Sequence, residues 1–165
     1  MMRWPPPVKR CGAWRMDLTL GSAAANSYLR AYAARHGIFA LRAPETLYLA
    51  TKSDSSGQPL QAASCYRIRG RDLETRWWSL TAYQRDQLIP NPLNRYSFSK
   101  TTVIADTDGN WEVHLGPRPQ PGNWLPSGKP KGNLTLVLRC YGPGRELLTN
   151  PDNVVLPEIV AEACS

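Results

Sequence analysis

The chain has 165 residues, a length that fits one domain, and a globule of this size buries roughly 70% of the surface that its unfolded form exposes. Its 20 basic and 13 acidic residues give a formal net charge of +7, which favours anionic partners. No recognition-helix, ribonucleoprotein-type or zinc-finger signature accompanies this charge, so we expect no specific nucleic-acid binding. No stretch approaches the roughly 20 apolar residues of a membrane-spanning helix, so we expect no membrane span in this chain.

The first segment, residues 1–12, is basic and proline-rich, which predicts a flexible arm. Residues 13–165 are then expected to form a single domain. Its first regular element is predicted to be a helix over residues 22–36, because Ser22 is a favoured capping residue and Gly37 can end the helix. The apolar side of this helix should lie against a sheet and consists of Ala25, Leu29, Tyr32, Ala33 and His36.

From Thr46 onward, short apolar runs alternate with proline and glycine turns, which is typical of strands. A hairpin is predicted to join residues 101–105 and 111–115 through the turn at 106–109. The other predicted strands cover residues 47–50, 62–69, 76–83, 134–141 and 154–160, the last of them kinked by Pro157. This pattern predicts a mainly β domain, a β-sandwich with one short N-terminal helix.

Two of these strands have faces that require different surroundings, because successive side chains of a strand point to opposite sides. In residues 76–83 the apolar face consists of Trp78, Leu80 and Ala82, and in residues 134–141 of Leu134, Leu136, Leu138 and Cys140. Aromatic, hydroxyl and guanidinium groups on the opposite faces suit an elongated, weakly polar ligand such as a sugar or a polyether. The proposed contact residues are Trp77, Ser79, Thr81, Tyr83, Arg139 and Tyr141. The alternative is that the tryptophans fill a core and that Arg139 pairs with Asp54 or Glu74.

A tryptophan also lies in a proline and glycine loop, in the segment Asn123-Trp-Leu-Pro126. Such a side chain is costly to expose, so Trp124 is expected either to plug the end of the sandwich or to act as a lid over the ligand. Asn123 is expected to bond to local backbone.

The four cysteines are widely spaced and form no Cys-x-x-Cys pair. Cys140 continues an apolar strand face, where it is expected to be a buried thiol. A disulfide between Cys65 and Cys164 would hold the C-terminal tail across the sheet, and it requires an oxidising compartment. The alternative is that both thiols are free.

The inventory of reactive side chains argues against common hydrolytic enzymes and against a metal site. The only histidines are His36 and His114, and the chain has neither a metal-binding motif nor a nucleophile elbow. We therefore expect no catalytic residue, metal or cofactor. A rival hypothesis is a hydrolase acting on a carbohydrate or lipid-like substrate through Asp54, Asp86 or Asp106, all of which lie in predicted turns or loops. Another is a structural subunit that docks on a protein partner through the basic arm.

Several motifs resemble a bacterial family, the domain of unknown function 1214, from about Trp14 to Pro157. They are Tyr28-Leu-Arg-Ala31, Glu45-Thr-Leu-Tyr48, Asp54-Ser-Ser-Gly-Gln-Pro-Leu60, Trp78-Ser-Leu-Thr-Ala-Tyr83, Asn94-Arg-Tyr-Ser97, Asp108-Gly109, Asn123-Trp-Leu-Pro126 and Leu136-Val-Leu-Arg-Cys-Tyr-Gly-Pro143. The resemblance implies a β-sandwich of jelly-roll type with a short helical start, and it provides no catalytic residues. Longer relatives place a second domain before this one, and shorter relatives have an N-terminal membrane helix that holds the domain in the periplasm.

The expected function is that of an envelope-associated binding or accessory module for an elongated carbohydrate- or polyether-like ligand. The resemblance implies a location on the periplasmic side of the envelope. The segment before Gly12 departs from the family because it could not span a membrane, and a cytoplasmic location is expected if the chain begins at Met1.

Overall fold

A computed structural model describes residues 9–35 and 40–164, apart from the side chains of Tyr32 and Arg35. Residues 1–8 of the predicted arm, and His36 and Gly37 of the predicted helix, lie outside the described residues. The larger sheet contains β1 (Lys9–Cys11), β2 (Trp14–Met16), β3 (Thr46–Thr51), β10 (Leu134–Pro143), β5 (Thr75–Gln84) and β6 (Gln87–Leu88) in that order, and β7 (Ser97–Ser99) also pairs with β5. The smaller sheet has the order β11 (Glu158–Glu162), β4 (Cys65–Arg71), β8 (Asn110–Gly116) and β9 (Trp124–Pro126). The helices are α1 (Ser27–Arg35), α2 (Arg145–Thr149) and the 3₁₀ helix η1 (Pro151–Asn153).

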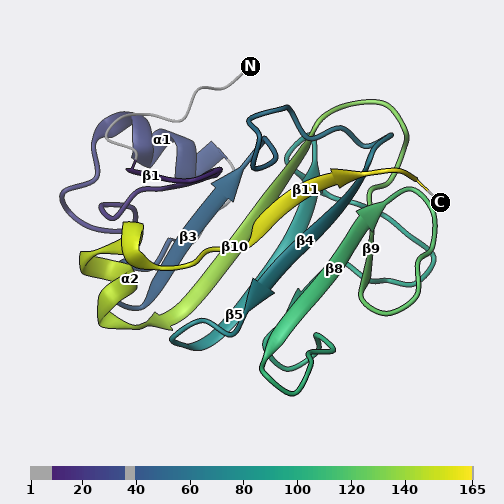
Figure 1. Ribbon diagram of the computed structural model, residues 1–165. Coiled ribbons are helices and arrows are strands. Elements are labelled where there is room, and N and C mark those ends of the chain that lie inside the picture. Colours follow the sequence, from purple (N-terminus) through teal and green to yellow (C-terminus); the bar gives the residue numbers. More distant parts are fainter. Residues whose placement is uncertain (1–8, 36–39, 165) are drawn as a thin grey trace.

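The two sheets pack face to face around one hydrophobic core, so the predicted mainly β architecture is confirmed (Figure 1). Trp78 of the larger sheet stacks on Trp111 of the smaller one, with ring centroids 5.0 Å apart and an angle of 29° between the planes. Gly70 lies directly beneath the Trp111 ring, where a Cβ atom would come within 2.2 Å of it. The jelly-roll connection remains a prediction.

Strands β5 and β10 are antiparallel neighbours at the centre of the larger sheet. Their apolar faces point into the core, as the alternation predicted: Trp78, Leu80, Leu138 and Cys140 are at most 1% exposed. The opposite faces of both strands therefore lie together on the outside of the same sheet.

The helix α1 begins at Ser27, five residues after the predicted start. Asn26 caps it, since its Oδ1 accepts a hydrogen bond of 2.9 Å from the backbone N–H of Leu29. Ser22 instead belongs to a preceding turn, where its hydroxyl donates to the carbonyl oxygen of Thr19. Leu29 is buried with Leu20 and Ala25 in a small cluster that packs on Tyr48, so α1 covers part of the outside of the larger sheet.

Residues 9–11, which the sequence assigned to the arm, form β1 of the larger sheet, so the arm does not extend to residue 12. The turn to β2 uses Gly12 with a φ of 59°. Two buried side chains hold this hairpin. Cys11 and Trp14 both enter the core, and the indole N–H of Trp14 donates to the carbonyl oxygen of Pro157 over 2.7 Å.

The predicted hairpin at residues 101–105 and 111–115 is wrong, although its turn forms as expected. Asp106 accepts backbone hydrogen bonds from Asp108 and Asn110 in that turn. A single bridge joins Ala105 to Trp111, while β8 pairs with β4 and with the parallel β9. The reason is Asn123. Its side-chain amide accepts a hydrogen bond from the backbone N–H of Ile104 and donates one to the carbonyl oxygen of Ile104, so these groups are not available to a neighbouring strand.

The last strand was predicted over residues 154–160 but begins at Glu158, after Pro157. A disulfide joins Cys65 of β4 to Cys164, with 5.3 Å between the Cα atoms. Cys11 and Cys140 are free and buried. Burial, together with the nearby Asp152, raises the pKa of Cys11 to about 11, and burial raises that of Cys140 to about 12, so neither is an activated thiol.

Candidate binding face

The outward side of the larger sheet brings together the predicted contact residues of β5 and β10. The pairing register places Trp77 opposite Tyr141 and Ser79 opposite Arg139. Residues opposite each other in neighbouring strands point to the same face. We call this surface the outer face; it consists of Thr46, Tyr48, Ala50, Trp77, Ser79, Thr81, Tyr83, Thr135, Val137, Arg139 and Tyr141.

Trp77 and Tyr141 form an aromatic pair at one end of the outer face. Their ring centroids are 5.3 Å apart and the planes are tilted by 53°. Both side chains are half-buried, so part of each ring faces solvent. A pair of rings that shares a face in this way offers a surface for C–H-rich ligands to stack on.

Arg139 lies across the centre of the outer face. Its guanidinium donates to the hydroxyl of Tyr83 over 2.6 Å, donates to the Thr81 hydroxyl over 3.4 Å and stands 5.6 Å from the Tyr83 ring centroid. Within residues 9–35 and 40–164, Arg139 forms no ion pair with Asp54 or Glu74. These contacts hold the guanidinium beside Thr81 and Tyr83, and they use only some of its five N–H groups.

Ser79 and Thr81 are less accessible than the sequence suggested. They are 6% and 5% exposed, because they are short side chains between larger neighbours and β7 pairs beside them. The groups of the outer face that a ligand can reach are therefore the rings and Arg139, and the two hydroxyls support them from below.

Sequence reasoning missed Tyr48 of β3, which faces outward and is the register partner of Arg139 on β10. Burial raises the pKa of the Tyr48 phenol, and the nearby Tyr141 adds to that effect. The alternation of residues 47–50 was the available signal, since it places Tyr48 on the face opposite Leu47 and Leu49.

Trp124 does not lie beside the other predicted contact residues. It belongs to β9 in the smaller sheet, where its register partner is His114. The side chain is 7% exposed, and its indole N–H donates to the carbonyl oxygen of Gly116 over 3.1 Å. Trp124 is thus fixed in the opposite layer, which corrects the expectation of a lid over the outer face.

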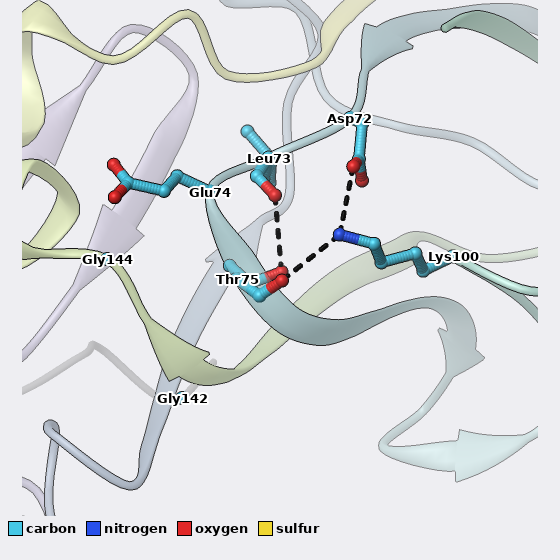
Figure 2. Close-up of a pocket in the computed structure, with 7 residues that line it drawn as sticks. All are labelled: Asp72, Leu73, Glu74, Thr75, Lys100, Gly142 and Gly144. Carbon is cyan, nitrogen blue, oxygen red and sulfur yellow. Dashed lines mark hydrogen bonds and ion pairs between the residues drawn. The ribbon is translucent and has the colours of Figure 1, made fainter.

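A hollow of about 440 Å³ lies at the ends of β5 and β10, two residues beyond the aromatic pair along each strand (Figure 2). The Lys100 ammonium donates to Asp72 over 2.9 Å and to the carbonyl oxygen of Thr75 over 3.1 Å. Burial alone would raise the pKa of Asp72, but hydrogen bonds from Lys100 and Trp78 lower it. The carboxylate therefore neutralises the ammonium, and Glu74 points away from this pair in Figure 2.

The smaller sheet has a charged outer surface next to a second hollow of about 880 Å³. The imidazole nitrogens of His114 lie 3.0 Å from a carboxylate oxygen of Glu162 and 3.4 Å from one of Glu112. A guanidinium nitrogen of Arg67 lies 2.7 Å from a carboxylate oxygen of Glu162. Every base of this group has an acidic partner, so the network ties β4, β8 and β11 together.

The carboxylates of the rival hydrolase hypothesis lie in separate turns. Asp54 accepts hydrogen bonds from Ser56 and Gln58, as a turn-forming residue does. Asp106 binds its own turn in the same way, and the bonds from Asn110 lower its pKa. Asp86 has a positive φ of 62° between β5 and β6. In the described part of the chain, no three His, Cys, Asp or Glu side chains gather to hold a metal ion.

Within the described residues, no helix has both the length and the apolar character needed to cross a bilayer.

Comparisons with known proteins identify a family of unknown function and similar solved structures. A family model described as "Protein of unknown function (DUF1214)" matches residues 45–145. The crystal structure of the VPA0106 protein from Vibrio parahaemolyticus is 25% identical, with a TM-score of 0.67 over 82% of this chain and 35% of that one. An uncharacterised protein from Burkholderia cenocepacia is 18% identical, with a TM-score of 0.47 over 72% of this chain and 30% of that one. The chain matches no curated protein, and it spans about a third of the length of these solved structures.

Proposed function

Because the chain belongs to the DUF1214 family, whose function is unknown, we propose its role from its own geometry: it is a binding module of the cell envelope. Its ligand is an elongated molecule of the carbohydrate or polyether type, which lies along the outer face. No catalysis is part of this proposal.

The observation that supports the proposal is the half-buried pair of Trp77 and Tyr141 on the same face as Arg139. Aromatic rings stack on the C–H faces of sugars, while the guanidinium orients ring oxygens and hydroxyls by hydrogen bonds. The outward residues of β3, β5 and β10 include no carboxylate. Such a surface combines apolar contact with a few fixed donors, as ligand sites do.

The periplasmic side of the envelope is the compartment that we propose. The Cys65–Cys164 disulfide supports it, because disulfides persist in oxidising compartments and the bacterial periplasm is one. We also propose that the sandwich has the jelly-roll connection, which the mostly antiparallel pairing of both sheets supports.

The test is a titration of the protein with hexameric oligosaccharides and with short polyethylene glycols. Binding is measured by calorimetry and by tryptophan fluorescence. We expect at least one class to bind and Trp77→Ala to weaken that binding at least tenfold, because the variant removes a stacking ring. Tyr28→Ala is the matched control, since Tyr28 is an aromatic residue 78% exposed on α1. Absence of binding throughout the panel, or equal affinity of Trp77→Ala and the unaltered protein, would contradict the proposal.

A further inference from the structure

Two arginines stand opposite each other at the edge of the larger sheet. Arg10 of β1 and Arg15 of β2 are register partners, and both are exposed. Neither guanidinium has a hydrogen bond or an ion pair to the part of the chain that the structure describes. Like charges directly opposite each other on two strands repel, so this pair costs stability unless an anion neutralises it.

Several other bases on the strands have an acidic partner. Lys9, next to Arg10, binds Asp152 over 3.1 Å. Arg67 and Arg69 both bind Glu112 across the smaller sheet. The arrangement at Arg10 and Arg15 differs from these ion pairs, because the two strands place one guanidinium directly opposite the other.

Both arginines point to the side of the outer face. Their strand neighbours Cys11, Trp14 and Met16 are buried in the core, so alternation turns Arg10 and Arg15 outward. The register continues this row across the sheet, from Arg15 to Ala50, Val137 and Thr81. With strands about 4.8 Å apart, the row from Arg10 to Thr81 is roughly 19 Å long.

No acidic side chain interrupts this row. The acid nearest to it along β2 is Asp17, which is 4% exposed and accepts hydrogen bonds from the backbone and hydroxyl of Thr19. Between this row and the aromatic pair, the same face carries Tyr48, on which the α1 cluster packs, the buried Ser79 and the half-buried Arg139. Its charges are guanidinium groups: Arg10, Arg15 and Arg139.

We infer that the ligand of the outer face is an acidic oligosaccharide, and that Arg10 and Arg15 together bind one of its carboxylates. This inference rests on the proposed function and names the substrate class of the same face. A guanidinium presents two parallel N–H donors that match a carboxylate, and two facing guanidiniums can hold one carboxylate between them. The sugar rings of the same chain then leave this row at Val137 and pass Arg139 to reach Trp77 and Tyr141.

The experiment compares a hexamer of galacturonate with its methyl ester, which has the same sugar chain without the charges. We expect the charged hexamer to bind at least tenfold more tightly at low salt. The double variant Arg10→Gln/Arg15→Gln should remove that difference. Arg118→Gln/Arg145→Gln is the matched control, because it removes the same charge from two exposed sites outside the outer face.

The outcomes separate this inference from the proposed function. Equal affinity for both hexamers, or equal losses in the two double variants, would overturn the acidic ligand while the Trp77-dependent binding of the ester still stands. Tight binding of the charged hexamer that depends on Arg10 and Arg15 but not on Trp77 would instead overturn the stacking role of the outer face. Binding of neither hexamer would overturn the acidic ligand, and the proposed function would fall with it only if no oligosaccharide or polyether of the panel bound.

Discussion

Asn123 shows how one buried amide can fix a loop. Its side chain accepts a hydrogen bond from the N–H of Ile104 and donates to the carbonyl oxygens of Ile104 and Glu112, each over 2.8 Å. We expect Asn123→Ala to lower the free energy of unfolding by about 2 kcal/mol, because it removes three hydrogen bonds between a buried amide and the backbone of Ile104 and Glu112. Urea unfolding measures this, with the exposed Asn133→Ala as control. Equal stability of the two variants would contradict the role of Asn123.

Glu162 links the C-terminal strand to the charged network of the smaller sheet. Burial alone would raise the pKa of Glu162, but hydrogen bonds from His114 and Arg67 lower it. A carboxyl group whose pKa is lower in the folded state than in the unfolded state stabilises the protein at pH values above its unfolded-state pKa, which is about 4.3 for Glu. This stabilisation is lost as the pH falls through the folded-state pKa.

We therefore expect Glu162→Gln to lower the free energy of unfolding by about 1 kcal/mol at pH 7. The difference from the unaltered protein should shrink as the pH falls below about 4, where the native carboxylate also takes up a proton. Urea unfolding at pH 7 and pH 3 measures both effects. Glu158→Gln is the control on the same strand, where we expect little change at either pH. A pH-independent loss in Glu162→Gln would disprove the assigned linkage.

At the scale of elements, β11 is an edge strand held at several points. It pairs with β4 on one side, Ser55 binds the backbone of Ile159 on the other, and the disulfide ties its end to Cys65. The disulfide closes a loop with a sequence separation of 99 residues.

Cys164→Ser should lower the free energy of unfolding by about 4 kcal/mol, because the unfolded chain gains the freedom of that long loop. Urea unfolding before and after treatment with dithiothreitol measures the effect. Reduction should reproduce the loss in the unaltered protein and should not affect the variant. If reduction changes nothing in the unaltered protein, the two sulfurs are not joined in the purified protein.

Elements defined by local patterns were predictable from the sequence. The alternation of residues 76–83 and 134–141 predicted both the strands and their buried faces. The partner of residues 111–115 was not predictable in this way, because Asn123 captures Ile104 from 19 positions away along the chain. The start of α1 was ambiguous for a different reason, since Ser22 and Asn26 are both good capping residues and only tertiary packing distinguishes them.

At the scale of the whole molecule, the candidate face depends on how strands from distant parts of the sequence are ordered. Alternation alone predicted that Trp77 and Arg139 point away from the core. It could not show that β5 and β10 are neighbours, nor that Trp124 belongs to the other sheet through a parallel pairing with β8. The opposition of Arg10 and Arg15 was also hidden, because the sequence assigned Arg10 to an arm and not to a strand.

Trp77 and Trp78 are adjacent in the chain, yet their indoles have opposite environments, one half-exposed on the outer face and one 1% exposed between the sheets. A quencher dissolved in the buffer will therefore reach the first chromophore and not the second. The near-ultraviolet dichroism of the Trp78–Trp111 stack will in turn report whether the two layers stay together. The protein thus contains separate optical reporters of surface occupancy and of layer separation, placed on consecutive residues of one strand.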